Sequence, residues 1–118
     1  MQKNVIHVQK WPHPDKPHEA TLRQVLEAEG LEPFRWEDQP LAVFEAQTFD
    51  FNRILYVVKG TIIFGFPIES EPTVMRAGDR LYIPAGITHN AAVGAEGVVC
   101  LEAHCTQPMG RERWAEIG

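Results

Sequence analysis

One segment of the chain, residues 77–89, reads AGDRLYIPAGITH. Gly78 and Asp79 predict a tight turn that leads into a short apolar strand. Pro84 ends that strand because proline has no backbone N–H to donate to a neighbouring strand. Gly86 permits the positive φ that reverses the chain. His89 then lies three residues into a returning strand, where one parity points its side chain into the protein.

Short strands are predicted on both sides of this segment. Runs rich in Val, Ile, Phe and Tyr, separated by glycine and proline, occur at residues 34–36, 41–49, 54–58, 61–66, 73–77, 80–83, 89–93 and 98–104. Many short strands at even spacing indicate an all-β sandwich or barrel. Before them we expect a strand at residues 4–9, a proline-rich loop, and a helix at residues 18–29 that ends at Gly30.

The pattern of residues 77–89 resembles the second motif of the cupin superfamily. Gly78, Pro84, Gly86 and His89 all match it, and Gly60 is similar to the glycine that ends the family's first motif. The resemblance covers residues 41–108 and implies an RmlC-like double-stranded β-helix, a six-stranded jelly-roll barrel with, here, a short N-terminal α-helix. We therefore predict one domain. Residues 1–40 pack a strand, a loop and a helix on the barrel, and residues 109–118 form a tail that is a last helical turn or a frayed end.

The metal ligands of the family are mostly missing from this chain. Metal-binding cupins take two histidines and a glutamate from the first motif and one histidine from the second. Counting back from Gly60, the first three positions hold Gln47, Phe49 and Arg53, and a spacing one residue longer supplies no histidine either. Only His89 remains, and one imidazole cannot hold a first-row metal against water. We therefore expect no metal cofactor.

A rearranged metal site is the alternative. Cys100, Glu102 and His104 alternate in the strand predicted at residues 98–104, so they share one face. If that face pointed inward, a divalent metal could bind to His89, Glu102 and His104. The opposite face is uniformly apolar, however, which favours a solvent-exposed position for these three residues.

The resemblance implies a pocket lined by Gln47, Phe49, Arg53, Tyr56 and His89. A guanidinium there can bind a carboxylate or phosphate at two points, unless it faces solvent or pairs with a neighbouring glutamate. We therefore predict a metal-free module that binds a small molecule, with an anionic molecule as one candidate. Two enzymatic alternatives stay open: a metal-dependent dioxygenase or isomerase, and a metal-free epimerase-like enzyme in which His89 acts as the base and a tyrosine as the acid.

Composition limits the partners and the location. The chain has 118 residues and a formal net charge of −5 at pH 7, which argues against nucleic acid and anionic membrane as partners. The two cysteines, at positions 100 and 105, are too far apart for a disulfide if they share one strand. Free thiols, and the lack of an apolar N-terminal stretch, predict a cytoplasmic protein. The resemblance also implies a homodimer, to which the strand at residues 4–9 could contribute.

Overall fold

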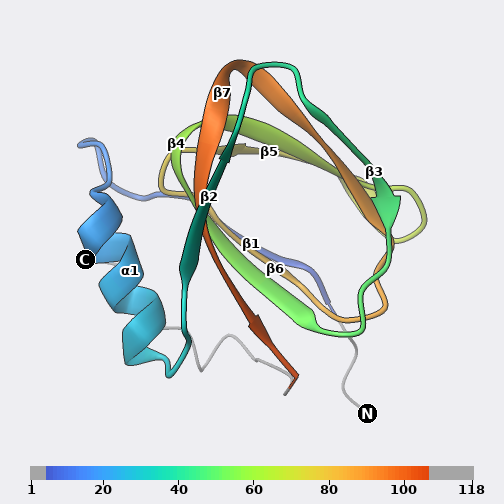
Figure 1. Ribbon diagram of the computed structural model, residues 1–118, viewed down its shortest axis with the longest axis horizontal. Coiled ribbons are helices and arrows are strands. Elements are labelled where there is room, and N and C mark those ends of the chain that lie inside the picture. The colour runs from blue at the N-terminus through green and yellow to red at the C-terminus, as the bar shows by residue number, and fades with distance from the viewer. Residues whose placement is uncertain (1–4, 107–118) are drawn as a thin grey trace.

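The computed structural model of the chain describes residues 5–106. Its strands curl into a barrel, and one helix lies against the outside (Figure 1). In chain order the elements are β1 (His7–Gln9), α1 (Glu19–Ala28), β2 (Phe34–Asp38), β3 (Val43–Gln47), β4 (Asn52–Phe66), β5 (Ser70–Arg76), β6 (Arg80–Ile83) and β7 (His89–Cys105). The strands pair antiparallel in the order β1-β6-β4-β7-β2, while β3 pairs with β7 and β5 with β4.

β4 and β7 are each one long, bent strand where the sequence predicts two. Gly60 in β4 and Gly97 in β7 have φ values of 82° and 80°, and the pairing of the two strands shifts register on both sides of Gly60. A Cβ atom on Gly60 would lie 2.0 Å from the carbonyl oxygen of Gly97, so this close approach requires glycine. The glycines therefore mark bulges that bend paired strands, and not loops between separate strands.

The two faces of β4 are buried by different neighbours. Leu55 belongs to the core inside the barrel. Ile54 and Tyr56 point the other way and pack with Leu22 and Leu26 of α1, which are both fully buried. Burial of each leucine stabilises the fold by roughly 1.5–3 kcal/mol. Parity along β4 therefore decides whether a side chain faces the barrel interior or the helix.

The N-terminal strand pairs with β6 of its own chain through residues His7–Gln9. One edge of β1 is therefore already paired within the chain, and a partner's sheet could pair only with the other edge. The tail expected at residues 109–118 lies outside the described residues. In the part of the chain that is described, no helix has the length and apolar character needed to cross a membrane.

Candidate functional site

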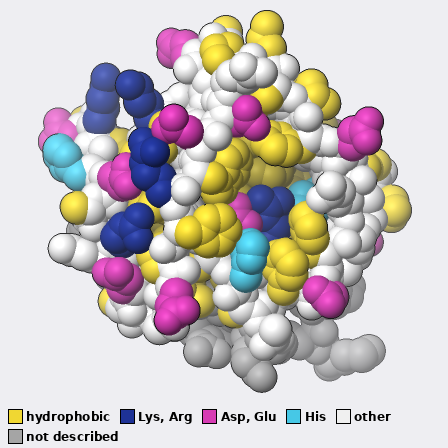
Figure 2. Space-filling model, viewed as in Figure 1, with side chains coloured by type: hydrophobic (Ala, Val, Ile, Leu, Met, Phe, Trp, Pro, Cys, Tyr) yellow, Lys and Arg dark blue, Asp and Glu magenta, His cyan; other side chains and the backbone are white. Residues whose placement is uncertain are grey.

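A cavity of about 300 Å³ opens at one end of the barrel. Figure 2 shows this hollow with hydrophobic side chains around it and basic, acidic and histidine side chains at its base. Its aromatic walls come from β2, β3, β4 and the segment between β3 and β4, and its polar groups come from β3, β4 and β7. The lining residues are Phe34, Trp36, Phe44, Glu45, Gln47, Phe49, Phe51, Arg53, Phe64, His89, Asn90, Ala91, Glu102 and His104.

The structure brings together four of the five residues predicted to line the pocket. Gln47, Phe49, Arg53 and His89 all lie at this cavity. Tyr56 does not, because it is an odd number of residues from Arg53 along β4 and so projects from the opposite face. It is fully buried beside α1.

Tyr56 instead belongs to a polar cluster between the barrel and the helix. Its hydroxyl accepts a hydrogen bond of 3.1 Å from Nη1 of Arg80. The same guanidinium donates to both carboxylate oxygens of Glu29, at 2.7 and 2.6 Å. Burial raises the pKa of Tyr56, so the hydroxyl stays protonated there. This tyrosine anchors the helix and lies away from the cavity.

Glu102 corrects the expectation for β7. The sequence favours exposure of the face that carries Cys100, Glu102 and His104, but Glu102 is only 2% exposed and Cys100 is completely buried. This face forms the cavity floor, with His104 at its rim. Alternation along β7 does not identify a solvent-exposed face because both faces are covered, one by the barrel interior and the other by α1. Leu101 on that other face packs in the helix-side core.

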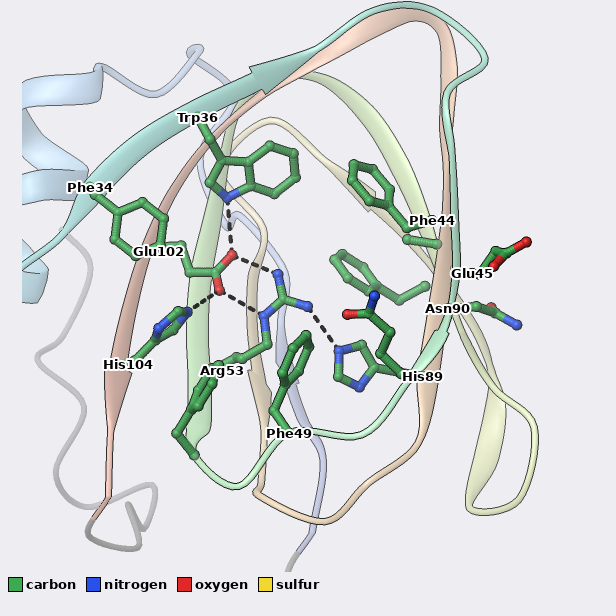
Figure 3. Close-up of a pocket in the computed structure, with 14 residues that line it drawn as sticks. Phe34, Trp36, Phe44, Glu45, Phe49, Arg53, His89, Asn90, Glu102 and His104 are labelled. Atoms are coloured by element: carbon green, nitrogen blue, oxygen red, sulfur yellow. Dashed lines mark hydrogen bonds and ion pairs between the residues drawn. The ribbon is translucent and has the colours of Figure 1, made fainter.

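Arg53 and Glu102 form a two-point ion pair on the cavity floor (Figure 3). Nε and Nη2 of Arg53 each donate to a different oxygen of Glu102, both at 2.7 Å. Glu102 also accepts hydrogen bonds from Nε1 of Trp36 at 3.0 Å and Nε2 of His104 at 2.5 Å. Burial by itself raises the pKa of Glu102, but the hydrogen bonds and charge of Arg53, with help from His104, hold that pKa below its ordinary value of 4.5. The carboxylate is therefore ionised and offsets the charge of Arg53.

His89 is a neutral acceptor in this network. Nη1 of Arg53 lies 2.8 Å from Nε2 of His89, and Nδ1 of His89 lies 2.8 Å from the carbonyl oxygen of Ile87. A guanidinium can only donate, so Nε2 accepts and Nδ1 carries the proton that it donates to Ile87. Burial lowers the pKa of His89 from its ordinary value of 6.5, and the charge of Arg53 lowers it further. Both ring nitrogens are thus engaged.

Aromatic rings hold the guanidinium in place. The Cζ atom of Arg53 lies 5.6 Å from the ring centroid of Phe49 and 5.9 Å from that of Phe64, within the range of cation–π attraction. A guanidinium has five N–H groups. Three of those on Arg53 have partners among the described residues, which leaves two for a bound molecule.

The donor set does not fit a divalent cation. Among the described residues, no group of three or more His, Cys, Asp or Glu side chains is arranged to hold a metal ion. In the rearranged set, the Arg53 guanidinium bonds to both Glu102 and His89 and so lies between two of the three expected ligands. Its permanent positive charge repels a cation at that point.

Apart from Phe49, the aromatic residues of the cavity wall were not predicted; they are Phe34, Trp36, Phe44, Phe51 and Phe64. Phe34 and Trp36 are two residues apart in β2, and Phe49 and Phe51 are two residues apart before β4. Such i, i+2 pairs place two rings on one face of an extended chain. This spacing could have indicated a shared aromatic face, although it does not show whether that face points into the barrel or toward solvent.

Comparison with known proteins places the fold and leaves the function open. No protein-family model and no curated protein match the sequence. Among solved structures, a cupin superfamily protein from Desulfitobacterium hafniense aligns over 91% of this chain and 83% of its own, with a TM-score of 0.57 and 11% identity. An RmlC-like cupin from Shewanella frigidimarina aligns over 65% of this chain and 67% of its own, with a TM-score of 0.56 and 18% identity. A Rhizobium leguminosarum protein of unknown function aligns over 65% and 71%, with a TM-score of 0.59 and 16% identity. These likenesses are of fold alone.

Proposed function

We propose that this chain, which has the cupin fold, binds a small molecule with an aromatic or apolar body and one hydrogen-bond-accepting group, without a metal ion. The observation that carries the proposal is the Arg53–Glu102 pair at the floor of an aromatic cavity. The pair supplies a fixed polar anchor, and the rings supply most of the contact surface. Ligand sites are typically apolar cavities with a few convergent polar groups.

The walls favour a ring or a compact apolar body. Phe49 and Phe51 stack with their centroids 4.9 Å apart, and Trp36 meets Phe44 edge-on at 6.0 Å. A cavity of about 300 Å³ lies at the small end of the usual range for ligand sites. A molecule of one or two rings suits that volume.

The floor favours an uncharged acceptor. Arg53 offers two N–H groups, but Glu102 already neutralises its charge. An anion placed here would lose its hydration without meeting a net positive charge, which is costly. A carbonyl or amide oxygen makes the same hydrogen bonds at a smaller desolvation cost. We therefore infer that neutral acceptors bind at least as well as the anions suggested by Arg53 alone.

The state of His89 weighs against the epimerase-like alternative. A general base needs a free lone pair within reach of its substrate. Nε2 of His89 accepts from Arg53, and its other nitrogen donates to Ile87. The imidazole would have to release the guanidinium before it could take a proton. We therefore assign His89 the role of orienting Arg53.

A titration with three related probes tests the proposal on the full chain. Phenylacetamide carries a ring and a neutral acceptor, phenylacetate a ring and an anion, and acetate only the anion. Ten non-hydrogen atoms at about −0.4 kcal/mol each give an expected dissociation constant of about 1 mM for phenylacetamide. Nitrogen-15 NMR signals of the Trp36 indole and the Arg53 Nε–H should shift saturably with phenylacetamide, equally or less with phenylacetate, and not with acetate.

Matched variants separate the cavity from the rest of the surface. Phe49→Ala removes a wall and should weaken phenylacetamide binding about five-fold or more. Ile68→Ala trims a side chain that is 76% exposed and lies outside the cavity lining, so binding should not change. If neither aromatic probe moves the Trp36 and Arg53 signals at about 10 mM, the proposed function is wrong.

A further inference from the structure

The cavity contains a second histidine, and one nitrogen of its ring is left for chemistry. Nε2 of His104 lies 2.5 Å from Oε2 of Glu102. Because the ionised carboxylate can only accept, Nε2 carries the proton, and Nδ1 of the neutral ring has the lone pair. Nδ1 of His104 forms no hydrogen bond within residues 5–106. His89 differs, because both of its ring nitrogens are engaged.

Three neighbours hold the His104 ring at the rim of the cavity. Glu102 binds one ring nitrogen, which is how a carboxylate orients the histidine base of a hydrolytic triad. The ring lies tilted against Phe51, with centroids 4.2 Å apart, and meets Phe34 edge-on at 5.2 Å. The side chain is nevertheless 36% exposed, so water reaches it from the mouth of the cavity.

His104 lies next to the guanidinium of Arg53. Strand pairing places Arg53 of β4 directly opposite His104 of β7, and residues opposite each other share one face of the sheet. Oε2 of Glu102 accepts from Nε of Arg53 at 2.7 Å and from Nε2 of His104 at 2.5 Å, so these two nitrogens lie no more than about 5.2 Å apart. Figure 3 shows the imidazole and the guanidinium on either side of this carboxylate. One small bound molecule can therefore contact both groups.

We propose that the cavity hydrolyses carboxylic esters with an aromatic or compact apolar acyl group, with His104 as the general base. The inference rests on the proposed function, because the ester carbonyl is the neutral acceptor that the two available N–H groups of Arg53 bind. The aromatic walls contact the acyl group. A cavity of about 300 Å³ leaves room only for a small alcohol group beside it.

The reaction needs only water as its second reactant. A water molecule beside Nδ1 of His104 gives a proton to that nitrogen while its oxygen forms a bond to the ester carbonyl carbon. The carbonyl electron pair moves onto the carbonyl oxygen, where the N–H groups of Arg53 stabilise the negative charge. The carbonyl then re-forms, the bond to the alcohol oxygen breaks, and that oxygen takes the proton from Nδ1. The products are a carboxylic acid and an alcohol, and the base is restored.

The charge of the cavity floor favours hydrolysis because it favours release of the product. The ester is neutral, whereas the acid that it forms ionises to a carboxylate at neutral pH. Glu102 already offsets the charge of Arg53, so a carboxylate that stayed would lose its hydration without meeting a net positive charge. The cavity therefore binds the ester at least as well as the product.

Hydrolysis of methyl phenylacetate by the full chain tests the inference. Chromatography at about pH 7.5 should show phenylacetate forming about 100–10,000-fold faster than in buffer. Phenylacetamide should inhibit the reaction with an inhibition constant equal to its dissociation constant from NMR, which places the activity in this cavity. If phenylacetamide binds but the ester is hydrolysed no faster than in buffer, the inference is wrong and the proposed function stands. If neither aromatic probe binds, both are wrong.

Matched glutamine variants test the role of His104. His104→Gln removes the base, while the new amide can still donate to Glu102. The hydrolysis rate should fall at least about 100-fold, and the dissociation constant for phenylacetamide should stay within about three-fold of the wild type. His18→Gln makes the same change at an exposed histidine outside the cavity lining and should keep the full rate. Persistent hydrolysis in His104→Gln, or its loss in His18→Gln, overturns the inference.

The pH dependence distinguishes a base from a residue that only supports the cavity wall. The wild-type rate should rise between about pH 5 and pH 8, because only a neutral imidazole can take a proton from water. Glu102 contacts this ring, Arg53 lies on the far side of that carboxylate, and His89 also titrates, so His104→Gln is measured over the same range. Near-ultraviolet circular dichroism at each pH checks that the protein stays folded. A flat wild-type profile, or the same rise in His104→Gln, overturns the inference.

Discussion

Both carboxylate oxygens of Glu102 lie 2.7 Å from the guanidinium of Arg53, one from Nε and the other from Nη2. The pair joins neighbouring strands, because Glu102 of β7 is aligned with Leu55 of β4, two residues beyond Arg53. It leaves the cavity floor with no net charge while two N–H groups stay available. The same geometry explains why the floor suits a neutral acceptor and not a cation.

Removing the charge of Glu102 should destabilise the protein. In Glu102→Gln the buried guanidinium loses its counter-charge, and breaking one side of a buried pair costs about 3–5 kcal/mol. Arg53 is 15% exposed, so water relieves part of the loss and we expect a decrease of about 2–3 kcal/mol in the free energy of unfolding. Urea denaturation measures this change. The single variants Arg53→Met and Glu102→Met and the double variant complete the test. The double variant should lose less unfolding free energy than the two single variants together. Strictly additive losses would mean that the pair is not coupled.

Acid should weaken the fold in two steps. The folded pKa of His89 is lowered from 6.5, so the unfolded chain binds this proton first and stability falls as the pH drops below about 6.5. The folded pKa of Glu102 is lowered from 4.5, so its contribution is complete above about pH 4.5 and is lost as the pH falls through the folded value. The free energy of unfolding should therefore decrease from pH 7 to pH 5 in the wild type.

The variant His89→Gln separates these two contributions. Glutamine keeps a hydrogen-bond acceptor for Arg53 but does not titrate. The slope between pH 7 and pH 5 should become smaller, while the loss at lower pH stays. An unchanged slope would show that other groups cause the first step.

The helix anchor should affect stability without affecting the cavity. Arg80 and Glu29 are almost completely buried, with side-chain exposures of 0% and 2%. Glu29→Gln should lower the free energy of unfolding by about 3 kcal/mol, measured by urea denaturation. The dissociation constant for phenylacetamide should stay within about two-fold of the wild type. A large change in that constant would indicate that the two sites are coupled.

The two cysteines should differ in reactivity. Cys100 is completely buried, and burial raises the pKa of its thiol. Cys105 is partly exposed at the end of β7. Ellman's reagent at pH 8 should therefore modify one thiol quickly in the native protein and the second only on unfolding. Cys105→Ser should remove the fast phase, and a fast phase that remains would show that the barrel opens readily.

Much of the fold could be predicted because its signals are local. Gly78, Pro84 and Gly86 constrain the backbone at their own positions, and the predicted jelly-roll barrel with one short N-terminal helix is confirmed. Glycine positions alone do not distinguish a loop from a bulge, however. Gly60 and Gly97 therefore suggested separate strands where β4 and β7 are continuous.

The floor of the cavity could be predicted only in part. Arg53 and His89 followed from motif spacing, whereas Glu102 was placed on the wrong side because its neighbour Leu101 is also buried. Alternation identifies an inward face only where one face meets solvent. Here α1 covers one side of β7 and the barrel encloses the other, and that arrangement depends on contacts between distant parts of the chain.

Elemental analysis of the untagged protein, purified without chelators, decides whether this cavity holds a metal ion. Arg53 and Glu102 neutralise each other on the cavity floor and leave no group of side chains there that could hold a metal ion among residues 5–106. We therefore predict less than about 0.1 equivalent of iron, manganese, nickel or zinc per chain, before and after dialysis against zinc. Close to one equivalent of tightly held metal, lost in Glu102→Gln, would contradict this prediction.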